Sequence, residues 1–254
     1  MGRRAAARAG GLNRAGPLRG LFVTGTGTEV GKTIVASAIA AALAERGERV
    51  AVFKPAVTGL DEPGAELPDH ELLRASACSA QAREDVAPYR FGPPVSPHLA
   101  AEQAGVRIEP GLLAARARRA CAGADVLVVE GVGGLLVPLT PDYLVRDLAR
   151  ELGLPLIVVA LPGLGTINHS LMTIESARSA GLEVRGVVLT PWPPEPAAIE
   201  RSNRDTIAAL SGVPVATLGR VEVSPSVGPA GLPVDRWLPE IGAGDVRRAV
   251  AGRF

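Results

Sequence analysis

From residue 20 onward, short runs of apolar, largely β-branched residues alternate along the chain with longer stretches of helical periodicity. Short apolar runs bounded by polar residues or glycine predict buried strands, and the longer stretches predict helices. The predicted strands are Leu21–Thr24, Val50–Lys54, Val126–Glu130, Leu156–Leu161, Val184–Leu189 and Val213–Leu218. The predicted helices lie near 32–46, 69–78, 110–122, 143–152, 167–180 and 197–211.

This alternation predicts an α/β fold, with a mainly parallel sheet and helices on both faces. Gly47, Gly153 and Gly181 each follow a predicted helix, where glycine favours helix termination. No internal repeat or linker divides the chain, so residues 20–254 are predicted to form a single domain. Ligands of such sheets bind beyond the carboxyl ends of the strands, so the polar residues at those ends are the first candidates for a site.

The composition is that of a globular protein. Of the 254 residues, 47% are hydrophobic and 21% are charged, which allows a sizeable core. Aromatic residues make up 3%, so we expect no nucleic-acid surface built on base stacking. Two cysteines outside any CxxC pair argue against a disulfide framework and favour the reducing cytoplasm. No apolar run approaches the roughly 18 residues of a membrane span, so no membrane partner is expected.

Residues 1–19 are rich in arginine, alanine and glycine and have no periodic apolar face. Five arginines precede the first acidic residue, Glu29, and without them the chain is slightly acidic. The segment lacks the apolar core of a secretory signal, although an organelle-targeting peptide has a similar composition. We expect residues 1–19 to be a flexible N-terminal tail.

The first predicted strand runs directly into GTGTEVGKT, residues 25–33, and then into a predicted helix. Glycines at such a junction let backbone N–H groups turn towards a ligand, and the helix N-terminus adds partial positive charge, so the loop suits phosphate. Lys32 is placed to reach the β- and γ-phosphates, and the Thr33 hydroxyl is placed to ligate Mg²⁺. The loop is one residue longer than the strict P-loop motif, which has glycine where this chain has Thr26. The segment predicts an NTP-binding site.

Three further residues stand where they could join this site. Lys54 ends the second predicted strand, where its ammonium could neutralise a phosphoryl group or an anionic acceptor, or could simply face solvent. Asp69 begins a predicted helix and suits either helix capping or a position near Mg²⁺. Glu130 follows four apolar residues and precedes Gly-Val-Gly-Gly. A buried acid there needs a cation, which makes Glu130 a candidate magnesium ligand.

These motifs, in this order, resemble those of the dethiobiotin synthetases, ATP-dependent P-loop ligases of biotin biosynthesis. The two most specific features are the elongated loop and the Lys-Pro-x-x-Thr-Gly segment. The resemblance spans residues 21 to about 220 and accounts for the additional loop residue. The matching segments are 25–33, Lys54–Gly59, Asp69, Ser96-Pro97-His98, Glu130–Gly134 and Gly165-Thr166-Ile167-Asn168-His169.

The resemblance implies conversion of 7,8-diaminononanoate, CO₂ and ATP to dethiobiotin, ADP and phosphate, through a carbamate and a carbamic–phosphoric anhydride. It implies Lys32 and Lys54 as catalytic residues and Thr58 as the residue that positions the diamine or carbamate. The implied ligands of the cofactor Mg²⁺ are Thr33, Asp69 and Glu130. The implied nucleotide contacts are Glu29, Val30, Gly31, Lys32, Thr33, Ile34, Asp69, Glu130, Gly131, Val132, Gly133, Thr190, Pro191, Val221, Glu222 and Val223.

The resemblance also implies a homodimer, with residues 165–169 and the following helix near the interface. Several positions depart from the family pattern. Gly27 stands where members usually have aspartate, Thr190 stands where many have asparagine, and the segment Val221–Val223 lacks the usual proline. We therefore expect intact triphosphate chemistry and altered base recognition, with ATP as co-substrate and other nucleoside triphosphates able to replace it.

Two other classes share this nucleotide fold. Switch-like ATPases of partitioning and septum placement typically carry an additional lysine near the start of the loop, where this chain has threonines. Amide synthases of cobalamin assembly normally carry a glutaminase domain, for which the chain leaves no room. Of the remaining features, His70 is expected on an exposed helix face, and the proline-rich stretches 190–196 and 223–239 are expected to be loops, the second a lid or surface arm.

Overall fold

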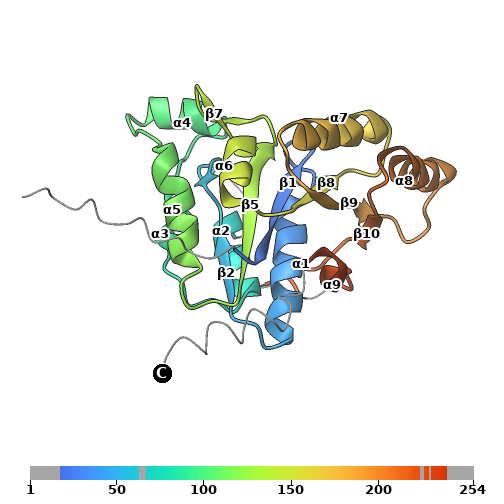
Figure 1. Cartoon of the computed structure of the whole chain (residues 1–254), viewed down its shortest axis with the longest axis horizontal. Helices are drawn as coiled ribbons and strands as arrows, with labels where there is room; N and C mark the ends of the chain where they lie inside the picture. The colour runs from blue at the N-terminus through green and yellow to red at the C-terminus, as the bar shows by residue number, and fades with distance from the viewer. Residues whose placement is uncertain (1–17, 63–66, 224–225, 229, 239–254) are drawn as a thin grey trace, which may run out of the picture.

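The computed structural model describes residues 18–62, 67–223, 226–228 and 230–238. Its centre is a sheet of six parallel strands in the order β10-β9-β8-β1-β5-β2 (Figure 1). The predicted α/β class and all six predicted strands are confirmed, with small differences at the strand ends. The strands are β1 (Gly20–Gly25), β2 (Val50–Phe53), β5 (Val126–Gly134), β8 (Leu156–Ala160), β9 (Val184–Trp192) and β10 (Val215–Gly219).

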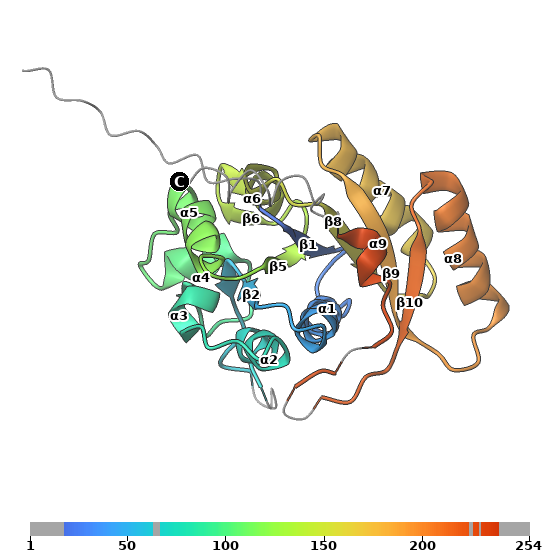
Figure 2. The same cartoon turned by 60° about the horizontal axis from the view of Figure 1, so that its bottom comes forward.

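Helices cover both faces of the sheet (Figure 2). One face carries α1 (Lys32–Glu45), α2 (Asp69–Ser76) and α9 (Val234–Trp237). The other carries α5 (Pro110–Ala120), α6 (Val145–Leu152), α7 (Thr166–Ser179) and α8 (Ala198–Ser211). All six predicted helices are therefore present, and no helix within the described ranges is both long and apolar enough to traverse a bilayer.

Several short elements were not predicted, because two to seven residues give no readable periodicity. Each lies in a connection between the longer elements. They are β3 (Ala56–Val57), α3 (Arg83–Val86), β4 (Tyr89–Arg90), α4 (Pro97–Gln103), β6 (Pro138–Thr140) and β7 (Tyr143–Leu144).

Alternation along β1 divides the core into two layers. Leu21 and Val23 pack with Ile39 of α1, whereas Phe22 packs on the other face with Leu148 of α6. Successive side chains of a strand point to opposite faces, and both faces of this sheet are covered by helices. Because both faces are buried, the strands have continuous apolar sequences. The buried sheet also gives the loop after β1 a rigid support.

The proline-rich segment after β10 is docked in the part that the structure describes, in contrast to the expected lid or surface arm. Val227 and Trp237 are buried in the core layer beside α1. The Val227 N–H donates a hydrogen bond to Ser76 Oγ at 2.9 Å. Trp237 lies so close to Gly186 that a Cβ there would stand 2.6 Å from the indole nitrogen. The apolar side chains between the prolines anchor this segment.

At the start of the described chain, Leu18 packs against the core and Arg19 forms an ion pair with Glu48. The rest of the expected tail, residues 1–17, lies outside the described residues.

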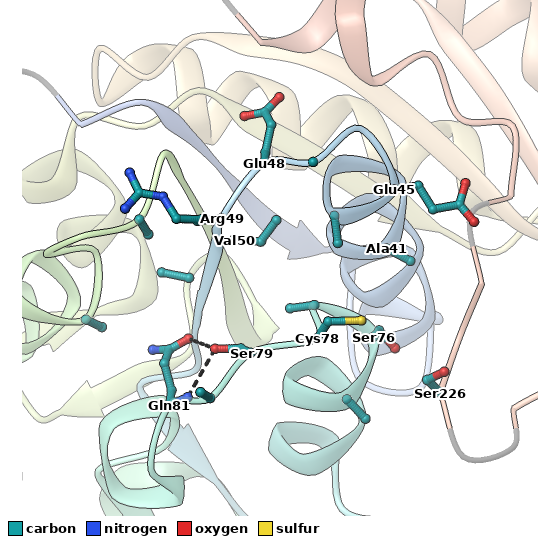
Figure 3. Close-up of a pocket in the computed structure, with 18 of the residues that line it drawn as sticks. Ala41, Glu45, Glu48, Arg49, Val50, Ser76, Cys78, Ser79, Gln81 and Ser226 are labelled. Carbon is teal, nitrogen blue, oxygen red and sulfur yellow. Dashed lines mark hydrogen bonds between the residues drawn. The ribbon is translucent and has the colours of Figure 1, made fainter.

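The edge strand β2 is covered by a side chain. Gln81 Oε1 accepts a hydrogen bond from the Val52 N–H at 2.8 Å, and Gln81 Nε2 donates to the Val52 carbonyl at 3.1 Å. Ser79 holds the Gln81 amide in place, as the dashed lines of Figure 3 show. The Gln81 amide thus satisfies the backbone groups that an edge strand leaves unpaired.

We expect Gln81→Glu to lower the free energy of unfolding by about 2 kcal/mol, because the Val52 carbonyl loses its donor and faces a carboxylate. In a protein of this size the melting temperature should fall by roughly 5 °C. The exposed Gln103→Glu is the matched control and should change stability by less than about 0.5 kcal/mol. Equal melting temperatures for the two variants would show that the Gln81 bonds contribute nothing.

Candidate functional site

The phosphate loop connects β1 to α1 at the carboxyl end of the sheet. The Thr26 N–H donates to the Val159 carbonyl at 2.9 Å, and Lys32 Nζ donates to the Gly27 carbonyl at 2.8 Å. Gly31 is the N-cap of α1, with φ 90° and no capping side chain, so the first-turn N–H groups of α1 have no side-chain acceptor. Such a helix terminus is suited to an anion.

Lys54 lies at the centre of an ion-pair cluster beside this loop. Its Nζ is 2.7 Å from Asp69 Oδ2 and 2.5 Å from Glu130 Oε1. The Thr33 hydroxyl donates to the same Glu130 oxygen at 2.9 Å. The side chains of Lys54 and Glu130 are 4% and 0% exposed, whereas that of Asp69 is 45% exposed. Lys54 therefore faces the crevice, and the alternative interpretation as a solvated edge lysine is wrong.

Burial and pairing act against each other on these groups. Burial alone lowers the pKa of Lys54, but Asp69 and Glu130 outweigh it and raise that pKa above its ordinary value. Burial raises the pKa of Glu130, and Lys54 only partly offsets this. Burial likewise opposes charge on Asp69, but hydrogen bonds and charge from Lys54 and Thr33 bring its pKa below the usual value. Pairing with Asp69 and Glu130 therefore favours the charged form of Lys54, whereas burial disfavours the charged form of Glu130.

The oxygen donors around Lys54 fit a magnesium ion. Glu130 Oε2 is buried and has no hydrogen-bond partner among the described residues. The described part of the chain contains no group of three or more His, Cys, Asp or Glu residues that could hold a metal. Two carboxylates and the Thr33 hydroxyl are hard oxygen ligands, and Mg²⁺ usually completes such a partial set with phosphate oxygens and water.

The structure resolves two alternatives at the start of α2. The N-cap of this helix is Pro68, and no side chain caps it. Asp69, the first residue of α2, pairs with Lys54 instead, so the interpretation of Asp69 as a helix cap is wrong. His70 is 5% exposed rather than on an exposed face, because α2 also packs against the core through this side.

The glycines after Glu130 are required by packing as well as by access. A Cβ on Gly131 would stand 3.0 Å from Val145 Cγ1 and 3.1 Å from a ring carbon of Phe22. Gly133 has φ 59°, a left-handed conformation that favours glycine. Val132 between them is half-buried. These glycines were expected to allow a ligand to approach closely, and they are also required by the packing of the surrounding side chains and by the backbone conformation.

The residues expected to contact the nucleotide base and the substrate are only partly brought together by the fold. Thr190, at the end of β9, is buried beside the loop, and a Cβ on Gly31 would stand 2.8 Å from its Cγ2. Pro191 is exposed, and the segment Val221–Val223 follows β10 without regular structure. Thr58 follows β3, half-buried, and within the described chain its hydroxyl forms no hydrogen bond. Thr190 thus lies at the phosphate loop, whereas Thr58 lies just after β3.

Two cavities differ in their relation to this chemistry. The larger, about 700 Å³, lies between the C-terminal ends of α1 and α2 and includes Glu45, Cys78 and Ser226 (Figure 3). It contains none of the loop or cluster residues. The second, about 480 Å³, is lined by 25–28, 134–138 and one side of α7. Because it includes the phosphate loop, it is the candidate substrate cavity.

Sequence reasoning missed part of this cavity. His169 lay in a recognised motif, but Thr173 and Ser176, which line the cavity with it, did not. Their spacing of four and seven residues from His169 places them on one face of a helix, and this was the available signal.

The sheet, the loop between β1 and α1 and the lysine–carboxylate cluster define a P-loop nucleotide-binding domain. A family model described as an AAA domain (AAA_26) matches residues 19–230. An ATP-dependent dethiobiotin synthetase BioD from Bacillus subtilis (strain 168) is 37% identical over 198 residues, 78% of this chain and 85% of that protein. Another from Rhodococcus jostii (strain RHA1) is 43% identical over 197 residues, 77% of this chain and 83% of that protein. The chain belongs to the dethiobiotin synthetase family.

A solved structure of chloroplast FtsY from Physcomitrella patens aligns with 92% of this chain and 68% of its own length. Its sequence identity is 16% and its TM-score is 0.45, so this likeness carries no argument about function.

Proposed function

We propose that this enzyme converts 7,8-diaminononanoate, CO₂ and ATP to dethiobiotin, ADP and phosphate, with Mg²⁺ as cofactor. Membership of the dethiobiotin synthetase family supports the reaction. The observation that carries the site is the buried Lys54 ammonium, 2.7 Å from Asp69 and 2.5 Å from Glu130, beside the phosphate loop. A fixed cation at that point is suited to an anionic acceptor meeting a phosphoryl group.

In this proposal one substrate amine takes up CO₂ and releases a proton, forming a carbamate. A carbamate oxygen attacks the γ-phosphorus and ADP leaves. The second amine then attacks the carbamoyl carbon and gives up a proton, phosphate leaves, and the ureido ring closes. Lys54 stabilises negative charge on the carbamate and on the transferring phosphoryl group. Lys32 stabilises charge on the β- and γ-phosphates.

The same proposal assigns the remaining site residues. Thr33, Asp69 and Glu130 hold Mg²⁺, which supplies positive charge against the phosphate oxygens. Thr58 positions the diamine or carbamate through its hydroxyl. The phosphates contact Glu29–Ile34 and Gly131–Gly133, and the base meets Thr190, Pro191 and Val221–Val223.

The test is phosphate release that depends on the diamine. We expect the purified protein to form dethiobiotin from 7,8-diaminononanoate, bicarbonate-derived CO₂, ATP and Mg²⁺, with one phosphate per product. A switch-like ATPase would release phosphate at the same rate without the diamine. A folded preparation that binds nucleotide but makes no dethiobiotin would refute the proposal.

We expect weak discrimination among nucleotide bases. An asparagine amide presents a donor and an acceptor in one plane, matching the N6 and N7 edge of adenine, whereas Thr190 presents one hydroxyl and Pro191 has no N–H. The Thr190 methyl group is moreover directed at Gly31. Thus kcat/KM for ATP and at least one other triphosphate, such as CTP, should agree within about tenfold.

The control for this prediction is Thr190→Asn, which should raise the ratio of ATP to CTP kcat/KM by about tenfold or more. Steady-state kinetics with ATP, CTP, GTP and UTP provide the comparison. A native preference for ATP above about a hundredfold over all three would contradict it, showing that backbone groups near 219–223 read the base unaided.

We further infer that the enzyme is a cytoplasmic homodimer whose interface includes α7 and the loop before it. Leu164 in that loop is 93% exposed, and Leu136 and Met172 beside the candidate substrate cavity are also largely exposed. Leu136 and Met172 line the same cavity, and clustered exposed apolar side chains favour a protein interface. Sedimentation should give a dimer for the native protein and a monomer for Leu164→Glu; a native monomer at micromolar concentration would contradict the inference.

A further inference from the structure

A buried asparagine of α8 holds the loop between β8 and α7. Asn203 is 7% exposed, and its Nδ2 donates to the Pro162 carbonyl at 2.9 Å and to the Gly163 carbonyl at 3.0 Å. The amide nitrogen of asparagine carries two hydrogens, so one side chain can satisfy both carbonyls. The two acceptors lie 41 and 40 positions earlier in the chain. The loop is therefore held by a helix that is distant in sequence.

Local interactions give this loop little rigidity. Residues 161–165 read Leu-Pro-Gly-Leu-Gly, and a Cβ on Gly163 would meet no atom within 4 Å. A glycine in open space leaves the backbone many accessible conformations. In the described chain no backbone N–H donates to the Pro162 carbonyl, and the Thr166 N–H lies 3.3 Å from the Gly163 carbonyl, which is long for a hydrogen bond. The Asn203 amide therefore supplies the bonds that select one conformation of the loop.

The loop in turn meets a side chain of the candidate substrate cavity. Gly165, the last residue of the loop, is the N-cap of α7 and has φ 90°. A Cβ on Gly165 would stand 3.5 Å from His169 Cε1, and the His169 N–H donates to the Gly165 carbonyl at 3.2 Å. The loop backbone thus lies against the His169 ring. Because His169 lines the 480 Å³ cavity, movement of the loop changes one wall of that cavity.

We propose that Asn203 is a positioning residue for binding of the diamine substrate, acting through the loop 161–165 and the His169 ring. The proposal rests on the proposed function and adds to it a residue that does not itself line the cavity. The loop follows β8, whose Val159 carbonyl accepts a hydrogen bond from Thr26 of the phosphate loop. Asn203 thus keeps the start of α7 at a fixed place relative to that loop. A wall held in place before the substrate arrives costs no ordering when the substrate binds.

The first test is Asn203→Ala, assayed with the diamine and ATP varied separately. We expect the KM for the diamine to rise about tenfold, while kcat and the KM for ATP change by less than about threefold, because Lys32 and Lys54 are untouched. A variant that only destabilised the fold would lower kcat through the folded fraction and leave both KM values unchanged. Asn203→Ser is a second variant and should give the same result, because its side chain is one bond too short to reach the two carbonyls.

The matched control is Ser211→Ala at the other end of α8. Ser211 is also 7% exposed, and its hydroxyl donates to the Ile207 carbonyl at 2.6 Å and accepts from the Val213 N–H at 3.1 Å. Each alanine variant removes two hydrogen bonds of a buried side chain, so both should lower the melting temperature by roughly 3–5 °C. Only Asn203→Ala releases the loop, so Ser211→Ala should keep the native KM for the diamine.

A second measurement, nuclear magnetic resonance of the histidine rings, requires no turnover. The chain has three histidines, and their ring C–H resonances can be assigned with the variants His70→Gln, His98→Gln and His169→Gln. In Asn203→Ala the His169 resonance should shift, while those of His70 and His98 stay at their native positions. In Ser211→Ala all three should stay at their native positions.

The outcomes separate this assignment from the proposed function. If the native enzyme forms dethiobiotin and Asn203→Ala keeps the native KM for the diamine, the assignment is overturned and the proposed function stands. The assignment is also overturned if the His169 resonance does not move, or if it moves equally in Ser211→Ala, since that is the result of a generally loosened α8. If the native enzyme forms no dethiobiotin, the proposed function fails and the assignment to the diamine fails with it.

Discussion

Replacing Lys54 by glutamine is expected to lower kcat for dethiobiotin formation by about 10²–10³-fold. Glutamine has a similar length but no charge, so the carbamate and the transferring phosphoryl group lose a preorganised cation. The KM for ATP should change little, because Lys32 and the loop N–H groups remain. Steady-state kinetics with the diamine and ATP varied separately provide the measurement.

The structure changes the expected stability of this variant. A lysine head group that merely faced the crevice could be removed without effect on folding, but Lys54 is buried against Glu130, which is fully buried itself. Removing one partner of a buried pair costs about 3 kcal/mol, or roughly 8 °C in melting temperature here. The double variant Lys54→Gln/Glu130→Gln should recover most of the melting temperature and none of the activity. A single variant with near-native kcat would contradict the catalytic role.

Replacing Lys32 by methionine should lower kcat/KM for ATP by about 10³-fold, with the loss visible already in nucleotide binding. The Lys32 ammonium is the positive charge that the loop offers to the phosphates. The methionine side chain fills the same space, because Lys32 Cδ lies 3.0 Å from the point where a Cβ on Gly25 would stand. Burial lowers the pKa of Lys32, so the folded protein gains little from this charge when no nucleotide is bound. The melting temperature should therefore change by less than about 2 °C.

The control for Lys32 is Arg46→Met at the opposite end of α1, where the arginine pairs with Asp235. This variant loses a cation from the same helix and should bind ATP as the native protein does. Titration with a fluorescent ATP analogue and calorimetric unfolding give the two readouts. Native nucleotide affinity in Lys32→Met would show that backbone N–H groups hold the phosphates alone.

The pattern of apolar residues was sufficient to predict the α/β class, because each parallel strand is buried on both faces and each long helix has a readable period. The phosphate loop could be recognised for a different reason. Its function depends on residues adjacent in sequence, from Gly25 to Thr33, so no distant contact is needed to assemble it. Lys32 and Lys54 are also the only lysines of the chain.

The relations between distant segments were decided by the tertiary structure. Asp69 was ambiguous between a helix cap and a site residue until α2 packed on α1 and brought its carboxylate to Lys54 and Thr33. Trp237 was assigned to a loop, because nothing local indicates that Gly186, about fifty residues earlier, leaves room for its ring.

The sequence by itself therefore determined the fold class, the phosphate loop and the family, since these depend on local periodicity and on residues close together in the chain. The tertiary structure decided which alternative each isolated polar residue takes. Those choices depend on burial and on partners far away in the sequence, such as Thr33 and Glu130, which are 97 positions apart. The free energy of a buried charge is determined by the groups that surround it in space, and only the packing of the sheet and helices supplies them.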